Sequence, residues 1–109
     1  MAITLTNKPQ VLTTGALATV YTCSSSRGAI VRSIQVANTH ATATQTIQVT
    51  LNQSSTDYSL VKNLTVPAGA AASVLTDIII MKNGDIIKGY ISSGNATSVD
   101  CLVSVEEYS

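Results

Sequence analysis

The chain has 109 residues, of which 45% are hydrophobic and 11% are charged, and its six basic and six acidic residues cancel. This length suits a single domain that buries a core without metal or disulfide support. A zero net charge argues against long-range attraction to nucleic acid or to an anionic membrane, and it does little to prevent self-association. No apolar run approaches the ~18 residues of a membrane span, and the N-terminus lacks the basic start and apolar stretch of a secretory signal, so we expect a protein made in a cytoplasm.

Residues 1–17 are interpreted as an N-terminal arm or short edge strand, and residues 18–109 as a single β-sandwich domain. Pro9 and Gly15 interrupt the first segment, and only its start, around residues 3–5, has the pattern of a strand. An arm of this kind can become ordered on a partner. Its candidate partner-contact residues are Ile3, Leu5, Lys8, Gln10 and Leu12.

From residue 18 onward, short runs rich in Val, Ile and Thr alternate with turn signals and predict strands. They cover residues 18–23, 29–38, 46–52, 58–66, 71–76, 78–81, 85–92 and 97–106. Asn83-Gly84 is the strongest turn signal, because both residues tolerate positive φ. Seven to eight short strands at this spacing predict an all-β fold, an antiparallel β-sandwich of jelly-roll or immunoglobulin-like type. Its core must be aliphatic, since the chain has no Phe and no Trp.

One position breaks the alternation of the strand at 29–38. Arg32 is in phase with the apolar residues Ile30, Ile34 and Val36, while Val31 falls on the other face. A β-bulge that shifts the register would explain this. Partial burial of Arg32 against a carboxylate, or contact of this face with a partner, are the alternatives, so Arg32 joins the candidate contact residues.

The residue types that carry catalysis or bind metals are sparse. His40, the only histidine, lies in a polar turn and is expected to be exposed there, while Cys23 and Cys101 are expected to be free, buried thiols within strands. No zinc spacing, clustered carboxylates or glycine-rich phosphate loop occurs, and the six basic residues are scattered. We therefore expect no catalytic residues, no metal, no cofactor, no nucleic-acid partner and no membrane partner.

Several segments carry a resemblance to a known class of proteins. They are residues 21–23 (YTC), 30–39 (IVRSIQVANT), 46–51 (TIQVTL), 66–69 (VPAG), 83–87 (NGDII) and 103–107 (VSVEE). In that order they resemble small β-sandwich virion structural proteins of tailed bacteriophages, which serve as capsid decoration (cement) proteins or as head-tail and tail components. The resemblance spans residues 19–107 and transfers no catalytic residues.

The resemblance implies a non-catalytic protein that binds the head lattice as a capsid decoration protein. Its partners would be the major capsid protein or other virion proteins and further copies of itself, with a trimer favoured, and its place would be the virion, after synthesis in the host cytoplasm. The alternative hypotheses are a head-tail or tail component, and a carbohydrate- or cell-surface-binding module of a tail or fibre. The last of these would need an exposed pair of tyrosines.

Overall fold

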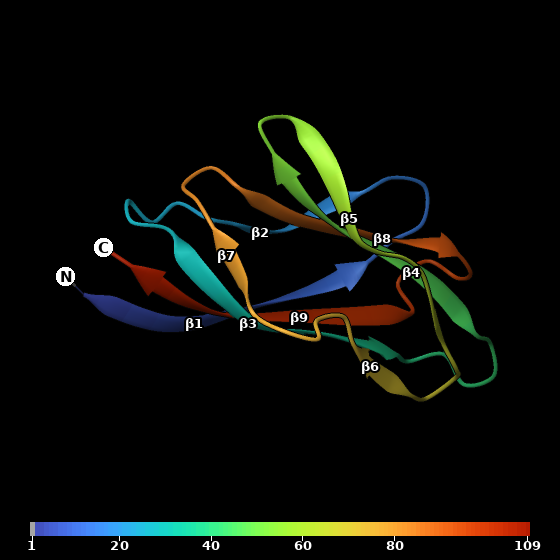
Figure 1. Ribbon diagram of the computed structural model, residues 1–109. Coiled ribbons are helices and arrows are strands. Elements are labelled where there is room, and N and C mark those ends of the chain that lie inside the picture. Colours follow the sequence, from blue (N-terminus) through green and yellow to red (C-terminus); the bar gives the residue numbers. More distant parts are fainter. Residues whose placement is uncertain (1) are drawn as a thin grey trace.

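A computed structural model describes residues 2–109, which form nine strands and no helix. The strands, shown in Figure 1, are β1 (Ile3–Leu12), β2 (Ala18–Thr22), β3 (Ala29–Asn38), β4 (Gln45–Gln53), β5 (Thr56–Val66), β6 (Ala71–Ser73), β7 (Ile79–Met81), β8 (Ile86–Ser93) and β9 (Val99–Tyr108). Within these residues no helix is long and apolar enough to cross a membrane.

The strands form two antiparallel sheets that pack face to face (Figure 1). The first sheet has the order β1-β9-β3-β6, with β7 also paired to β3, and the second has the order β2-β8-β4-β5. The short strands β6 and β7 share one side of β3, so they act as two halves of one interrupted strand. With that pair counted as one, eight strands divide equally between the sheets, and successive strands lie in opposite sheets except at the β4–β5 hairpin, as in a jelly roll. The predicted antiparallel sandwich is confirmed, and the strand order selects the jelly-roll form.

Aliphatic side chains fill the space between the sheets. In β9, Val99, Cys101, Val103 and Val105 are all buried, and the residues between them face outward. The same alternation buries Ile47 and Val49 of β4 and Ile87 and Ile91 of β8. β-branched side chains pack well on pleated surfaces and lose little rotamer freedom there, which explains why a core without Phe or Trp is sufficient.

Strand β1 is longer than the sequence pattern predicts. It pairs with β9 over its whole length, from Ile3↔Tyr108 to Leu12↔Val99, and continues through Pro9. Proline is tolerated because β1 is an edge strand, where a residue needs no N–H on its free side. Pro9, which made residues 1–17 look irregular, is therefore compatible with an edge strand and does not end β1.

The bulge that the sequence suggested in β3 is present. The register between β3 and β9 shifts between Val31 and Ser33, so that Arg32 is the extra residue. Val31 and Ile34 both face the core, while the side chain of Arg32 is exposed.

Candidate interaction surface

The candidate residues of β1 divide between its two faces. Ile3 and Leu5 point to the outer face of the first sheet and are 56% and 75% exposed. Lys8 and Gln10 lie on the opposite face of the strand, where Lys8 is exposed and Gln10 is half-buried. Leu12, on that same face, is fully buried in the core, so it does not belong to a contact surface. The exposed candidates of β1 thus lie toward its N-terminal end.

Further apolar residues gather on the outer face of the first sheet. Val11 of β1, Leu102 of β9 and Ile80 of β7 are exposed, and Ile80 is 71% exposed. The strand registers place them on the same side as Ile3 and Leu5, because residues directly opposite in paired strands share a face. We call these five residues (Ile3, Leu5, Val11, Ile80 and Leu102) the outer apolar face.

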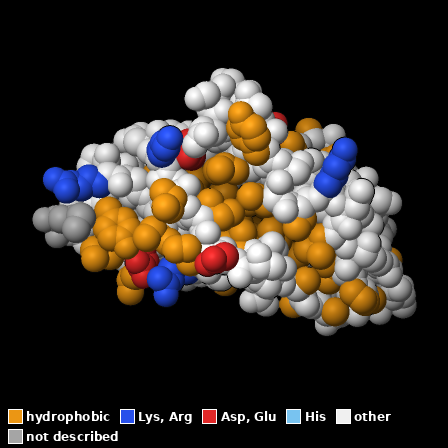
Figure 2. Space-filling model, in the orientation of Figure 1, with side chains coloured by type: hydrophobic (Ala, Val, Ile, Leu, Met, Phe, Trp, Pro, Cys, Tyr) orange, Lys and Arg blue, Asp and Glu red, His pale blue; other side chains and the backbone are white. Residues whose placement is uncertain are grey.

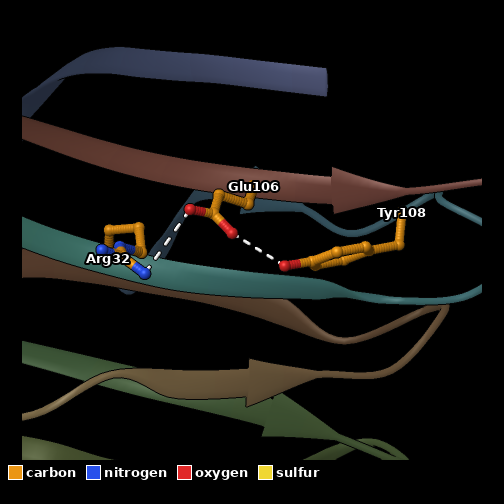
Figure 3. Close-up of polar contacts among 3 residues, drawn as sticks. All are labelled: Arg32, Glu106 and Tyr108. Atoms are coloured by element: carbon orange, nitrogen blue, oxygen red, sulfur yellow. Dashed lines mark hydrogen bonds and ion pairs between the residues drawn. The ribbon is translucent and has the colours of Figure 1, made fainter. Parts of the chain in front are cut away.

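Arg32 lies on this same side of the first sheet, in a small polar network. Its Nη1 atom is 3.5 Å from Oε1 of Glu106, and the hydroxyl of Tyr108 donates a hydrogen bond of 2.7 Å to Oε2 of Glu106 (Figure 3). This hydrogen bond raises the pKa of Tyr108 above its ordinary value. Glu106 is the register partner of Leu5, so the structure brings Arg32 and Leu5 to one region. An ion pair this exposed stabilises the fold by less than about 1 kcal/mol. The contribution of the Arg32–Glu106 pair to stability is therefore small.

A second apolar feature lies between the two sheets, on the side away from β1. Leu60 of β5, Ile79 of β7 and the connecting residues Val74 to Ile78 line a shallow groove of about 250 Å³. Figure 2 shows hydrophobic side chains lying open in the middle of this side, between the β5 hairpin and β7. Leu60 packs against the core but is only half-buried, so part of its side chain is open to this groove.

The side chains that could take part in catalysis or metal binding make structural hydrogen bonds instead. The ring of His40 is half-buried rather than exposed, and its Nδ1 accepts the backbone N–H groups of Thr42 and Ala43 at 3.1 and 2.9 Å. The hydroxyl of Tyr21 donates a 2.5 Å hydrogen bond to Glu107. Burial, and then this hydrogen bond, raise the pKa of Tyr21 above its ordinary value. Within residues 2–109, no group of three or more His, Cys, Asp or Glu side chains is placed to hold a metal ion.

The two cysteines are free and buried, at 0% exposure for Cys23 and 1% for Cys101. Tyr21, two residues before Cys23, bonds to Glu107, and Cys101 lies six positions before Glu107 along β9. At ~3.3 Å per residue that separation is roughly 20 Å, well beyond the reach of a disulfide. Burial raises the pKa of both thiols above its ordinary value, which makes them poor nucleophiles.

The four tyrosines do not form an exposed pair. Tyr21 is buried, and Tyr108 lies on the outer face of the first sheet. In the second sheet, Tyr58 is on the same face as the buried residue Ile87, because both lie opposite Leu51. Tyr90 is three positions beyond Ile87 along β8, so it lies on the other face. The structure thus offers no paired aromatic platform for a sugar among its described residues.

No protein-family model matches this sequence, and no curated protein matches it. Among solved structures, the fold is similar to a protein of Bacillus endospore appendages, described as a novel family of disulfide-linked pili. The similarity has a TM-score of 0.59 and 16% sequence identity, and it covers 98% of this chain and 89% of that one. At this level of identity the likeness concerns the fold, a small all-β domain.

Most of the outer apolar face lies outside the residues that sequence reasoning selected. Val11, Ile80 and Leu102 each sit in a strand where an apolar residue on the polar face is unremarkable by itself. The signal lies in their combination across β1, β9 and β7, and combining them requires the strand order.

Proposed function

We propose that this chain is a non-catalytic structural subunit that acts by assembling with copies of itself and with neighbouring proteins in a larger particle or fibre. The observation that carries the proposal is the outer apolar face. Five exposed aliphatic side chains on one side of one sheet are unusual for an isolated soluble domain, and such surfaces mark sites of protein contact. The zero net charge of the chain adds no long-range repulsion between copies.

Two kinds of assembly are the finer candidates. The resemblance of the sequence to small virion proteins of tailed phages supports a decoration protein on a capsid, and that assignment rests on the sequence alone. The similarity in fold to the endospore appendage protein supports a subunit of a pilus-like appendage. Both are repetitive protein lattices, so they share the requirement for a self-associating or lattice-binding surface.

The similarity to a protein of disulfide-linked pili raises the question of whether the two cysteines could link copies of this chain. Because Cys23 and Cys101 are buried, neither can link to another copy without opening of the sandwich. We therefore propose that copies of this chain associate through non-covalent contacts. Titration of thiols in the assembled protein checks this point: we expect two free thiols after unfolding without reductant, and fewer than two would contradict it.

A carbohydrate-binding module has less support. The hypothesis needs an exposed pair of tyrosines, but Tyr21 is buried and the other three tyrosines point to different faces. Retention of the protein on a glycan array would overturn this view.

The first experiment measures the mass of the purified chain by light scattering over a range of concentrations, followed by electron microscopy. Growth of mass with concentration supports the proposal, and ordered filaments of the chain alone favour the appendage. Saturable, stoichiometric binding to undecorated phage heads favours the decoration protein. A strict monomer that binds no lattice would contradict both.

A further inference from the structure

The free side of β1 forms one edge of the first sheet. Ala2 and Ser109 exchange two backbone hydrogen bonds of 3.0 Å, and the register between β1 and β9 is regular from there to Leu12. In an antiparallel pair, such doubly bonded positions alternate with unbonded ones. The even-numbered residues of β1 therefore bond to β9, and the odd-numbered ones point their backbone groups to the free side. Within residues 2–109 no strand pairs with that side.

Pro9 divides this edge into two unequal parts. As an odd-numbered residue it occupies the free side, where it offers no N–H and its ring keeps another strand away. N-terminal to it, Ile3, Leu5 and Asn7 each present both an N–H and a C=O. All residues from Ala2 to Pro9 are exposed on both faces of the strand, so this half of β1 has neither a lateral partner nor a covering layer.

A second copy of the chain offers a matching edge. If two β1 strands run antiparallel with Leu5 opposite Leu5, then Ile3 lies opposite Asn7. All N–H and C=O groups of these three residues then find partners in both copies. Pro9 falls outside the paired segment. The pairing also brings the exposed side chains of Ile3 and Leu5 together across the contact.

The charges of β1 and its neighbour fit this register. Residues 2–7 carry no charge, and Lys8 lies opposite Ala2 of the other copy, so no like charges face each other. The nearest acidic group, Glu106, lies beside Leu5 on β9. The two copies of Glu106 would be three strand spacings apart, roughly 14 Å, which exceeds the Debye length of ~8 Å in physiological salt. By contrast, the edge strand β5 carries Asp57 and Lys62 and has an irregular register with β4.

We infer that two copies of this chain associate by antiparallel pairing of residues 3–7 of β1, with Leu5 on the two-fold axis. The inference rests on the proposed function, since it names the contact by which the subunit assembles. The contact is isologous, so it closes as a dimer. It joins the two first sheets into one sheet and leaves the remaining residues of both outer apolar faces on the same side, free for a further contact.

The test exchanges charges at the two-fold axis. We expect Leu5→Lys alone and Leu5→Glu alone each to raise the dissociation constant of the dimer by at least about tenfold, because each places two like charges opposite each other. An equimolar mixture of the two variants restores association, because each introduced lysine then meets an introduced glutamate. Thr65→Lys, at an exposed position of the edge strand β5 in the second sheet, is the matched control and leaves dimerisation unchanged. Analytical ultracentrifugation measures these four samples and the unaltered chain.

The outcomes separate this inference from the proposed function. If the unaltered chain assembles but the Leu5 variants assemble equally well, or their mixture shows no recovery, the β1 contact is wrong while the assembly function stands. If the unaltered chain is a monomer at all concentrations and binds no lattice, the proposed function fails first. The Leu5 side chain is exposed, so these variants are expected to fold, and circular dichroism checks this.

Discussion

At the scale of single residues, buried amides hold one end of the sandwich together. The side-chain nitrogen of Asn38 donates to the carbonyls of Ala43 and Val66 at 2.8 and 2.9 Å, and its oxygen accepts the N–H of His40 at 3.0 Å. The buried Gln45 accepts the backbone N–H of Asn95 at 2.7 Å. Apart from the carbonyl of Val66 at the end of β5, the backbone partners belong to loops outside the sheets. Leaving such a buried group unpaired costs about 1–3 kcal/mol.

Gly94 shows how little room this arrangement leaves. It has a φ of 143°, and a Cβ atom there would clash with Oε1 of Gln45. We expect Gly94→Ala to lower the free energy of unfolding by more than about 2 kcal/mol, because it displaces Gln45 from the bond to Asn95. Gly69→Ala is the control, since Gly69 has a φ of 71° with open space around it and should cost only about 1 kcal/mol. Urea denaturation measures both, and equal losses would contradict the role of Gln45.

Cys101 gives a prediction for alkaline pH. Burial raises the pKa of its thiol from 9.0 to about 12. Between these values the unfolded chain loses the proton and the folded chain keeps it, so stability is full below pH 9 and falls as pH rises, by about 1.4 kcal/mol per pH unit for this group. We expect the stability of Cys101→Val to fall less steeply between pH 9 and pH 11 in urea denaturation. An identical slope in both proteins would show that Cys101 is not responsible.

At the scale of elements, the bulge of β3 reconciles its sequence with its pairing. Arg32 is the one residue that interrupts the alternation, and Val31 and Ile34 on either side of the bulge both face the core. Removing Arg32 would bring these two residues into the ordinary spacing of two. The bulge is thus a local insertion that the rest of the strand does not require.

We therefore expect a chain with Arg32 deleted to fold, with a loss of stability of no more than about 1 kcal/mol, which includes the exposed ion pair with Glu106. Deletion of Gln35 is the matched control. It would place Ile34 and Val36 next to each other and turn one of them out of the core, so this variant should not fold. Circular dichroism and thermal unfolding compare the two. Unfolding of both variants would mean that the bulge itself is needed.

At the scale of the whole molecule, the two ends of the described chain meet. Ala2 and Ser109 are hydrogen-bonded, and Figure 1 shows the N- and C-terminal ends side by side at one end of the sandwich. The β4–β5 hairpin turns at Ser54 and Ser55, both exposed and with φ of 52° and 66°. A short flexible linker could therefore join the ends while the chain opens at this turn.

We expect such a circular permutant, opened between Ser54 and Ser55, to keep the β-sheet circular dichroism spectrum and a cooperative unfolding transition. A permutant opened between Ile34 and Gln35, in the middle of β3, is the control and should not fold, because β3 pairs with β9, β6 and β7. If both behave alike, the adjacency of the ends does not govern tolerance to permutation.

The sequence by itself determined the class of fold and much of its local detail. Alternation of Val, Ile and Thr located most strands, and β3 begins and ends at the predicted residues, Ala29 and Asn38. The buried cysteines followed from the same periodicity, because a period of two assigns each side chain to a face. The break at Arg32 suggested a bulge as one of three explanations, and the pairing of β3 with β9 selects it.

Only the tertiary structure decided which strands are neighbours, and therefore where the surface lies. Pro9 looked like an interruption because its effect depends on whether the strand is central or at an edge. Leu12 looked like part of an exposed arm, but β1 carries it into the core. The outer apolar face combines residues from β1, β7 and β9, which are far apart in the sequence. No short stretch of the sequence therefore shows that these residues lie on one surface. Local pattern fixes the face on which a side chain lies, whereas topology fixes what that face meets.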